Sequence, residues 1–221
     1  MIKAFLLGDL YMPAITLVVY LSAWKSIQKK EWLILVYCIF NIVLFSITDI
    51  MAEYGIHNAP LYHINSLVEL WMVSYYLLKK IAPANFKMLF WGVGIIYTAF
   101  FFVNVALWED WSVFNSNSAG VTSLIILFLS MYYLLALSKT DDILYFQRLP
   151  SFWIVSGFLI YNAASVLVLL SYKYFTYIHM PNEANRLWFV LSAAIIIKFV
   201  LISTGLLCHR KRQATHLPFL L

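Results

Sequence analysis

The chain of 221 residues is 63% hydrophobic and 11% charged, with a mean hydropathy of +0.83 and a formal net charge of +5. Soluble globular domains differ strongly from this composition, since about a quarter of their residues are charged. The composition therefore excludes a soluble enzyme or binding domain and predicts an integral membrane protein.

Apolar stretches that are long enough to cross a bilayer, which takes roughly 20 helical residues, recur along the chain. We expect one domain, an all-α bundle of seven transmembrane helices. The expected spans are residues 8–25, 32–52, 61–78, 88–108, 117–138, 151–172 and 187–208. The first should be retained rather than cleaved as a signal peptide, because Asp9 interrupts its start and no A-x-A cleavage site follows. The third is the least apolar, because Glu69 interrupts it.

Basic residues are unevenly distributed among the connections between these spans. Connections that are rich in Lys and Arg stay on the cytoplasmic side of a bilayer. One set of connections holds Lys25, Lys29, Lys30, Lys79, Lys80, Lys87, Lys139, Arg148, Arg210, Lys211 and Arg212. The opposite set holds the basic residues Lys3, Lys173 and Arg186 and the acidic residues Glu53, Glu109, Asp110 and Glu183. This alternation supports seven spans, with the N-terminus outside and the C-terminus cytoplasmic.

The positive charge indicates the molecular surroundings of the protein. The basic residues fringe the spans rather than forming a patch on a folded domain, so we expect anionic lipid headgroups and no nucleic acid as partners. Cys38 and Cys208 fall in or beside the cytoplasmic halves of their spans, and a structural disulfide is therefore not expected. The predicted location is a cell membrane, with a bacterial inner membrane as our first choice.

Polar residues inside the spans recur at helical spacing, which predicts inward-facing stripes. They are Asn41, Thr48 and Asp49 in the second span, continued by Glu53 just beyond it, Tyr62, Asn65, Ser66, Glu69 and Tyr76 in the third, and Tyr161, Asn162, Ser165 and Tyr172 in the sixth. The seventh span carries Lys198, flanked on its own face by Ala194 and Gly205. Small residues such as these allow a neighbouring helix to approach closely.

Two charged residues of opposite sign lie at similar depth. At a rise of about 1.5 Å per residue, Glu69 lies about eight residues and Lys198 about eleven residues below the outer starts of their spans. A charge near the middle of a bilayer costs roughly 2.5–3.5 kcal/mol on insertion scales. We therefore predict that Glu69 and Lys198 pair with each other, with Asp49 as the second choice of partner for Lys198.

This predicted pair has two interpretations, and the sequence leaves both open. In the first, Glu69 and Lys198 hold two helices together, and Asn65 and Asn162 form hydrogen bonds between helices. In the second, the pair lines a ligand or proton site, to which Tyr161 also contributes.

A lysine in the seventh helix and a carboxylate in the third resemble the arrangement of rhodopsins, in which that lysine holds retinal as a Schiff base. The rest of the sequence departs from that family. The third span lacks the Asp-Trp and Thr-Thr-Pro elements of microbial rhodopsins, and the sixth lacks their Trp-x-x-Tyr-Pro stretch. Ala194 stands where an Asp would precede the lysine. We expect no retinal and no other cofactor.

The segments LYHINSLVELW, FWIVSGFLIY and KFVLISTG resemble small uncharacterised bacterial membrane proteins with seven helices. The resemblance runs along the whole chain. It implies the architecture and draws attention to His63, Glu69 and Lys198, but it implies no activity.

A metal site is a less favoured alternative. The potential ligands on the expected external side are Asp49, Glu53, His57, His63 and His179. If the second helix extended to His57, three of them would share one face. The stretch EYGIHNAP, with Gly55 and Pro60, predicts instead that this helix ends before His57.

The sequence lacks a G-x-S-x-G motif, a Walker-type motif and a nucleophile–base set, so we expect no enzymatic activity. Our first hypothesis is a receptor- or sensor-like protein that binds a small molecule or lipid near Glu69 and Lys198. The connections are too short to hold an output domain, so it would act through a cytoplasmic or membrane partner. The alternative is a transporter of a small solute, with or without proton coupling. The ligand and the oligomeric state stay open.

Overall fold

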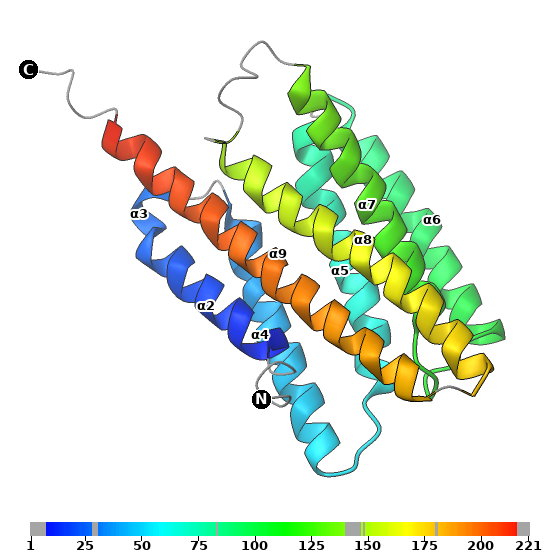
Figure 1. Cartoon of the computed structure of the whole chain (residues 1–221). Coiled ribbons are helices and arrows are strands. Elements are labelled where there is room, and N and C mark those ends of the chain that lie inside the picture. Colours follow the sequence, from blue (N-terminus) through cyan, green and yellow to red (C-terminus); the bar gives the residue numbers. More distant parts are fainter. Residues whose placement is uncertain are drawn as a thin grey trace, which may run out of the picture.

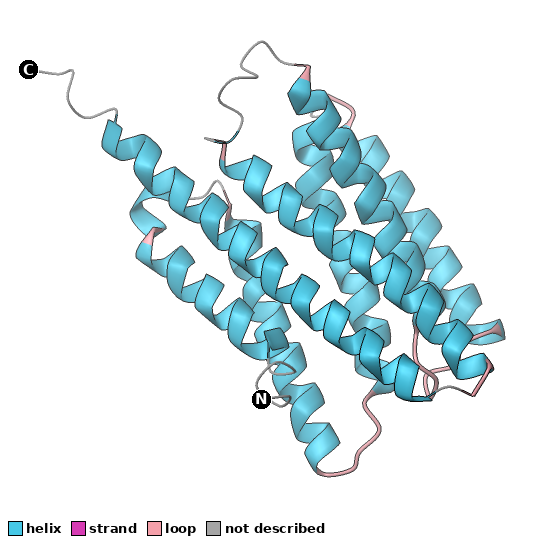
Figure 2. Cartoon of the chain, viewed as in Figure 1, coloured by secondary structure: helices cyan, strands magenta, loops and turns pink. Residues whose placement is uncertain are grey.

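The computed structural model describes residues 8–27, 31–82, 84–139, 147, 149–179 and 181–215. The regular structure in these ranges consists of eight helices, α2 to α9 (Figures 1 and 2). They are α2 Gly8–Ser22, α3 Trp24–Ile27, α4 Trp32–Glu53, α5 Ala59–Ile81, α6 Phe86–Leu107, α7 Ser116–Ser138, α8 Pro150–Tyr177 and α9 Pro181–Thr215. The all-helical prediction is confirmed for the described residues.

Five of these helices are long and apolar enough to cross a bilayer. They are α4, α6, α7, the part of α8 from Pro150 to Tyr172 and the part of α9 from Arg186 to Cys208. Helix α2 is apolar but has only 15 residues, and α5 carries the polar stripe that includes Glu69. These apolar helices indicate a multi-pass membrane protein.

Local sequence explains where the helices begin and end. Pro60 lies in the first turn of α5, where its missing N–H has no intrahelical acceptor to lose. Helix α4 ends at Glu53, and Gly55 follows with φ of +66°, a left-handed conformation that favours glycine. Helix α9 begins at Pro181 and runs to Thr215, well beyond the expected span, because no helix breaker interrupts it.

Six helices form a closed ring in the order α2, α4, α5, α7, α8, α9, and α6 packs outside this ring against α5 and α7 (Figure 1). We call the end at which α2, α5, α7 and α9 begin the N end of the bundle, and the opposite end the C end. Near the C end, Lys80 Nζ forms a 3.1 Å ion pair with Glu31 Oε1, which ties α5 to the residue before α4.

Helices α8 and α9 approach each other closely at two glycines. A Cβ atom on Gly157 would lie 2.8 Å from the carbonyl oxygen of Lys198, and a Cβ atom on Gly205 would lie 2.6 Å from that of Pro150. Since real Cβ atoms do not approach backbone oxygens so closely, only glycine allows this packing. Gly205 therefore has the role that its small size suggested.

The main hydrophobic core fills the C-end half of the ring. Its largest members are Tyr20, Tyr37, Tyr76, Phe158 and Phe199, from α2, α4, α5, α8 and α9. A smaller cluster of Leu70, Tyr97 and Phe101 joins α5 to α6. The N-end half of the ring is therefore the part that leaves room for a pocket.

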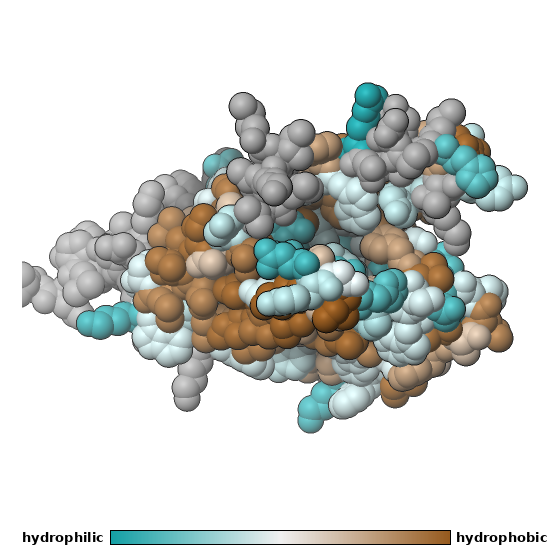
Figure 3. All heavy atoms as spheres, turned by 90° about the horizontal axis from the view of Figure 1, so that it is seen from below, coloured by the Kyte–Doolittle hydropathy of each residue, from teal (hydrophilic) through white to brown (hydrophobic). Residues whose placement is uncertain are grey.

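The outer faces of the helices are apolar. Phe102, Phe128, Leu167 and Leu170 are 58–68% exposed. Figure 3, a view from below, shows brown hydrophobic residues over much of that face, with paler and teal polar residues among them. Exposed apolar area on this scale matches the hydrocarbon tails of lipids.

The glycine contacts lead to a test of the α8–α9 packing. We expect Gly205→Ala to lower the free energy of unfolding by about 1–3 kcal/mol, because the new methyl group would force the two backbones apart. The thermal unfolding midpoint in detergent is the measurement. Gly92→Ala on α6 is the matched control, because a Cβ atom there has no neighbour within 4 Å. Equal effects of both changes would contradict the proposed contact.

Candidate functional site

Three side chains from three helices meet inside the ring: Tyr37 of α4, Glu69 of α5 and Lys198 of α9. Lys198 Nζ donates a 2.9 Å hydrogen bond to Tyr37 Oη, which donates a 2.8 Å hydrogen bond to Glu69 Oε1. The distance from Lys198 Nζ to the same carboxylate oxygen is 3.8 Å. The structure thus brings the two residues of the predicted pair together, with Tyr37 as a bridge that sequence reasoning missed.

Aromatic rings surround the ammonium group of Lys198. Its Nζ lies 3.7 Å from the ring centroid of Tyr161, 4.9 Å from that of Phe199 and 5.4 Å from that of Tyr37. Lys198 is only 2% exposed. A desolvated cation gains about 2 kcal/mol or more from such a ring face, which helps to offset the lost hydration.

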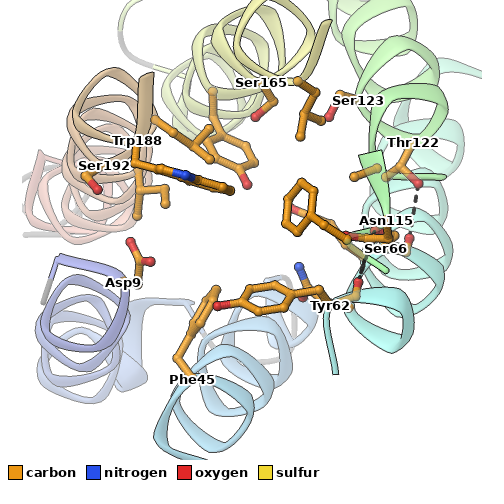
Figure 4. A pocket seen from close by; sticks show the side chains of 18 of the residues that line it. Asp9, Phe45, Tyr62, Ser66, Asn115, Thr122, Ser123, Ser165, Trp188 and Ser192 are labelled. Carbon is orange, nitrogen blue, oxygen red and sulfur yellow. Dashed lines mark hydrogen bonds between the residues drawn. The ribbon is translucent and has the colours of Figure 1, made fainter. Parts of the chain in front are cut away.

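A pocket of about 370 Å³ extends from Glu69 towards the N end of the ring (Figure 4). Its acidic lining residues are Asp9, Asp49 and Glu69, and its aromatic ones are Phe45, Tyr62, Phe114, Tyr161 and Trp188. Its neutral polar lining residues are Asn65, Ser66, Asn115, Thr122, Ser123, Ser165 and Ser192. Lys198 does not line the pocket, because Glu69 and Tyr161 form the wall in front of it.

Three aromatic rings pack together at the rim of the pocket. The ring centroid of Phe114 lies 5.5 Å from that of Tyr172 and 5.4 Å from that of Trp188, and the last two lie 5.4 Å apart. Phe114 precedes α7, whereas the other two residues belong to α8 and α9. The rim therefore joins three segments that are distant in the sequence.

The segment before α7 is fixed to α5 by hydrogen bonds. His63 Nε2 donates to the carbonyl oxygen of Val113 at 2.9 Å. Asn115 Nδ2 donates to the carbonyl oxygen of Tyr62 at 2.7 Å and to Ser66 Oγ at 2.5 Å. These bonds fix the rim of the pocket to its wall on α5.

Asp49, the second choice of partner for Lys198, is not in contact with it, because Lys198 pairs with Glu69. It lies 12 residues beyond Tyr37 on α4, or about 18 Å at the helical rise, so it is close to the N end rather than level with Lys198. It is exposed and lines the pocket. The second carboxylate that interacts electrostatically with Lys198 is Asp9 of α2.

Sequence reasoning named Asp9 but did not assign it to the site. The residue lines the pocket, and its Oδ1 is buried without a hydrogen-bond partner among the described residues. A carboxylate at the start of an apolar helix was the available signal. For Tyr37 the signal was its position four residues before Asn41, on the same buried stripe of α4.

The two asparagines of the predicted site differ in their surroundings. Asn65 lines the pocket, as expected. Asn162 does not, and its Nδ2 donates a 2.8 Å hydrogen bond to the carbonyl oxygen of Phe158 in its own helix. That hydrogen bond lies within α8, so the Asn162 amide nitrogen does not form the expected hydrogen bond between helices.

The potential metal ligands are dispersed. Helix α4 ends at Glu53, so His57 does not continue the face of Asp49. His63 is bound to the segment before α7, and His179 lies in the turn after α8 with φ of +57°. Within the described ranges, no group of three or more His, Cys, Asp or Glu side chains is arranged to hold a metal ion.

No family model matches this chain, and neither a curated protein nor a solved structure gives a match. The site must therefore be interpreted from its own chemistry. A buried carboxylate that faces a cavity on one side and an ammonium group on the other can exchange one charged or hydrogen-bonding partner for another.

The buried pair leads to a double-mutant test. Lys198→Met and Glu69→Gln should each lower the free energy of unfolding by about 3–5 kcal/mol, because each leaves a buried partner uncompensated. The double variant should lose less than the sum, with a coupling of about 0.5–3 kcal/mol. Unfolding in detergent measures all three, and Lys79→Met, at an exposed lysine, is the control. Strictly additive losses would show that the two groups do not interact.

Proposed function

We propose that this protein is a receptor-like membrane protein that binds a small molecule in the pocket between Glu69 and the N end of the ring. The volume of about 370 Å³ falls in the range of roughly 300–1,000 Å³ that is usual for small-molecule sites. The lining combines aromatic walls with a few convergent polar groups, as such sites do.

The position of Glu69 is the observation that carries this proposal. Its carboxylate lines the pocket, and its Oε1 also accepts the hydrogen bond from Tyr37 and faces Lys198. A ligand that bonds to Glu69 therefore competes with contacts that join α4, α5 and α9. Occupancy of the pocket would change how these helices pack, and α9 extends to Thr215 at the C end, where a partner protein can respond.

A closed floor supports binding rather than continuous permeation. Towards the C end from Glu69, the ring is filled by buried side chains that include Tyr37, Tyr76, Phe158 and Phe199. A solute that entered from the N end would meet this core. We therefore favour a receptor over a transporter.

We further propose that α2 and α5 cross the membrane with the five apolar helices, which gives seven spans. Both are members of the ring rather than peripheral to it. The loop charges assign the N end to the outside and the C end to the cytoplasm of a cell membrane, in agreement with a pocket that receives external ligands. Of the residues behind this assignment, Lys3, Lys29, Lys30 and Arg148 lie outside the described ranges.

The orientation can be tested with reporter fusions. A reporter after Leu221 should give a cytoplasmic signal, and reporters inserted in 109–118 or 173–186 should give external signals, because the basic connections stay in the cytoplasm. Enzymatic reporters that are active on one side only provide the measurement. A cytoplasmic signal from 109–118 would overturn the seven-span arrangement.

Ligand binding can be tested with a variant that fills the pocket. We expect Ala119→Phe, at a lining position of α7, to abolish the rise in unfolding temperature that small amphiphiles cause in the unchanged protein. The compounds are matched triplets that share a phenylethyl, indolylethyl or hexyl body and end in an ammonium, hydroxyl or carboxylate group. Leu135→Phe, at an exposed position of the same helix, should keep the response.

Two outcomes would contradict the proposal. The first is that no compound of any charge stabilises the protein, which would mean that the pocket is not a binding site. The second is uptake of a compound into proteoliposomes that is lost in Glu69→Gln, which would favour transport over reception.

A further inference from the structure

The charges around the pocket do not balance. Asp9, Asp49 and Glu69 line it, and no Lys, Arg or His side chain is among its described lining residues. Lys198 compensates Glu69 from behind the wall. Among the described residues, neither Asp9 nor Asp49 has an ion-pair partner. The pocket therefore presents two carboxylates that no cationic side chain of the described residues contacts directly, although Lys198 attracts Asp9 from farther away.

Two buried oxygen atoms in the wall of the pocket have no hydrogen-bond partner of good geometry in the described part of the chain. Oδ1 of Asp9 is one of them, and Oγ of Ser165, a residue that is 3% exposed, is the other. Figure 4 shows the two side chains on different walls of the same cavity. Because a buried polar atom without a partner is costly, a bound molecule that supplied hydrogen bonds to these two positions would be stabilised by them.

Aromatic rings flank the carboxylate of Asp9. In Figure 4 it lies on the wall between Trp188 and Phe45, and Tyr62 follows next to Phe45. A cation near such ring faces is attracted to their negative potential, and Trp is the most effective ring. The same rings bury the apolar body of a ligand.

An anionic ligand lacks comparable partners. The N-terminus of α7 reaches the pocket, but Glu109 already accepts hydrogen bonds from the backbone N–H of Asn117, at 2.9 Å, and from Ser116 Oγ, at 2.7 Å. An added anion would also be repelled by Asp9 and Asp49, which interact electrostatically with each other. A cation between these two carboxylates would relieve that repulsion.

We propose that the pocket binds a small organic cation, with its ammonium group held by Asp9 and Asp49 and its apolar body lying among Phe45, Tyr62 and Trp188. This inference rests on the proposed function, because it names the class of ligand for the same pocket.

The test compares head groups on a constant body. In the matched triplets, the ammonium compound of at least one body should bind the unchanged protein at least tenfold more tightly than its hydroxyl and carboxylate counterparts. Calorimetric titration of the protein in lipid nanodiscs gives the dissociation constants. This comparison needs no variant, so it does not depend on how well a mutant folds.

Substitutions then locate the ammonium group. Asp9→Asn and Asp49→Asn should each weaken binding of the ammonium compound about tenfold or more. Neither change should alter the dissociation constant of the hydroxyl compound. Glu53→Gln is the matched control, since Glu53 is an exposed carboxylate one turn beyond Asp49 that does not line the pocket.

The outcomes separate the two proposals. If hydroxyl or carboxylate compounds bind as well as the ammonium compounds, the pocket is a binding site but not one for cations. If nothing binds, both proposals fail. If Asp9→Asn and Asp49→Asn bind the ammonium compound as tightly as the unchanged protein does, the assignment of the head group is overturned. If Ca²⁺ or Mg²⁺ alone stabilises the protein, and this stabilisation depends on Asp9, the site binds a metal ion rather than an organic cation.

Discussion

The ammonium group of Lys198 is the constraint on which the interior of this bundle depends. A charge in an apolar ring requires a counter-charge, hydrogen bonds and polarisable surroundings, since water does not reach it. Glu69, Tyr37, Tyr161 and Phe199 meet these needs together. They come from α4, α5, α8 and α9, so contacts with one charged group join four helices at the same depth.

This constraint also divides the ring into two unlike halves. On the C-end side of Glu69 the helices face one another through large apolar and aromatic side chains, and the interior is filled. On the N-end side they carry short hydroxyl and amide groups among the aromatic residues, and a cavity remains. The carboxylate of Glu69 lies at the boundary. It therefore both joins helices and forms part of the wall of the pocket.

Rigidity at the rim and adaptability at the boundary have different physical origins. The rim is held by hydrogen bonds from His63 and Asn115 to backbone and side-chain oxygens, which leave little freedom to the segment before α7. At the boundary, Glu69 and Lys198 are 3.8 Å apart and share Tyr37, so a new partner for either one alters an existing bond. The walls of this pocket are fixed, whereas Glu69 at its floor can exchange one bonding partner for another. Such a pocket suits a protein whose helix packing responds to a bound molecule.

The sequence by itself determined the all-helical class, because a chain this apolar must satisfy its backbone hydrogen bonds within helices when it lies in lipid. It also indicated that Glu69 and Lys198 pair, because depth can be counted along each span. Counting gives depth but neither the rotation of a helix about its axis nor its neighbours in the ring. The bridge through Tyr37 and the position of Asp9 in the wall of the pocket were therefore decided only by tertiary packing. That packing places α2 between α4 and α9 and brings the start of the first described helix to the wall of the pocket.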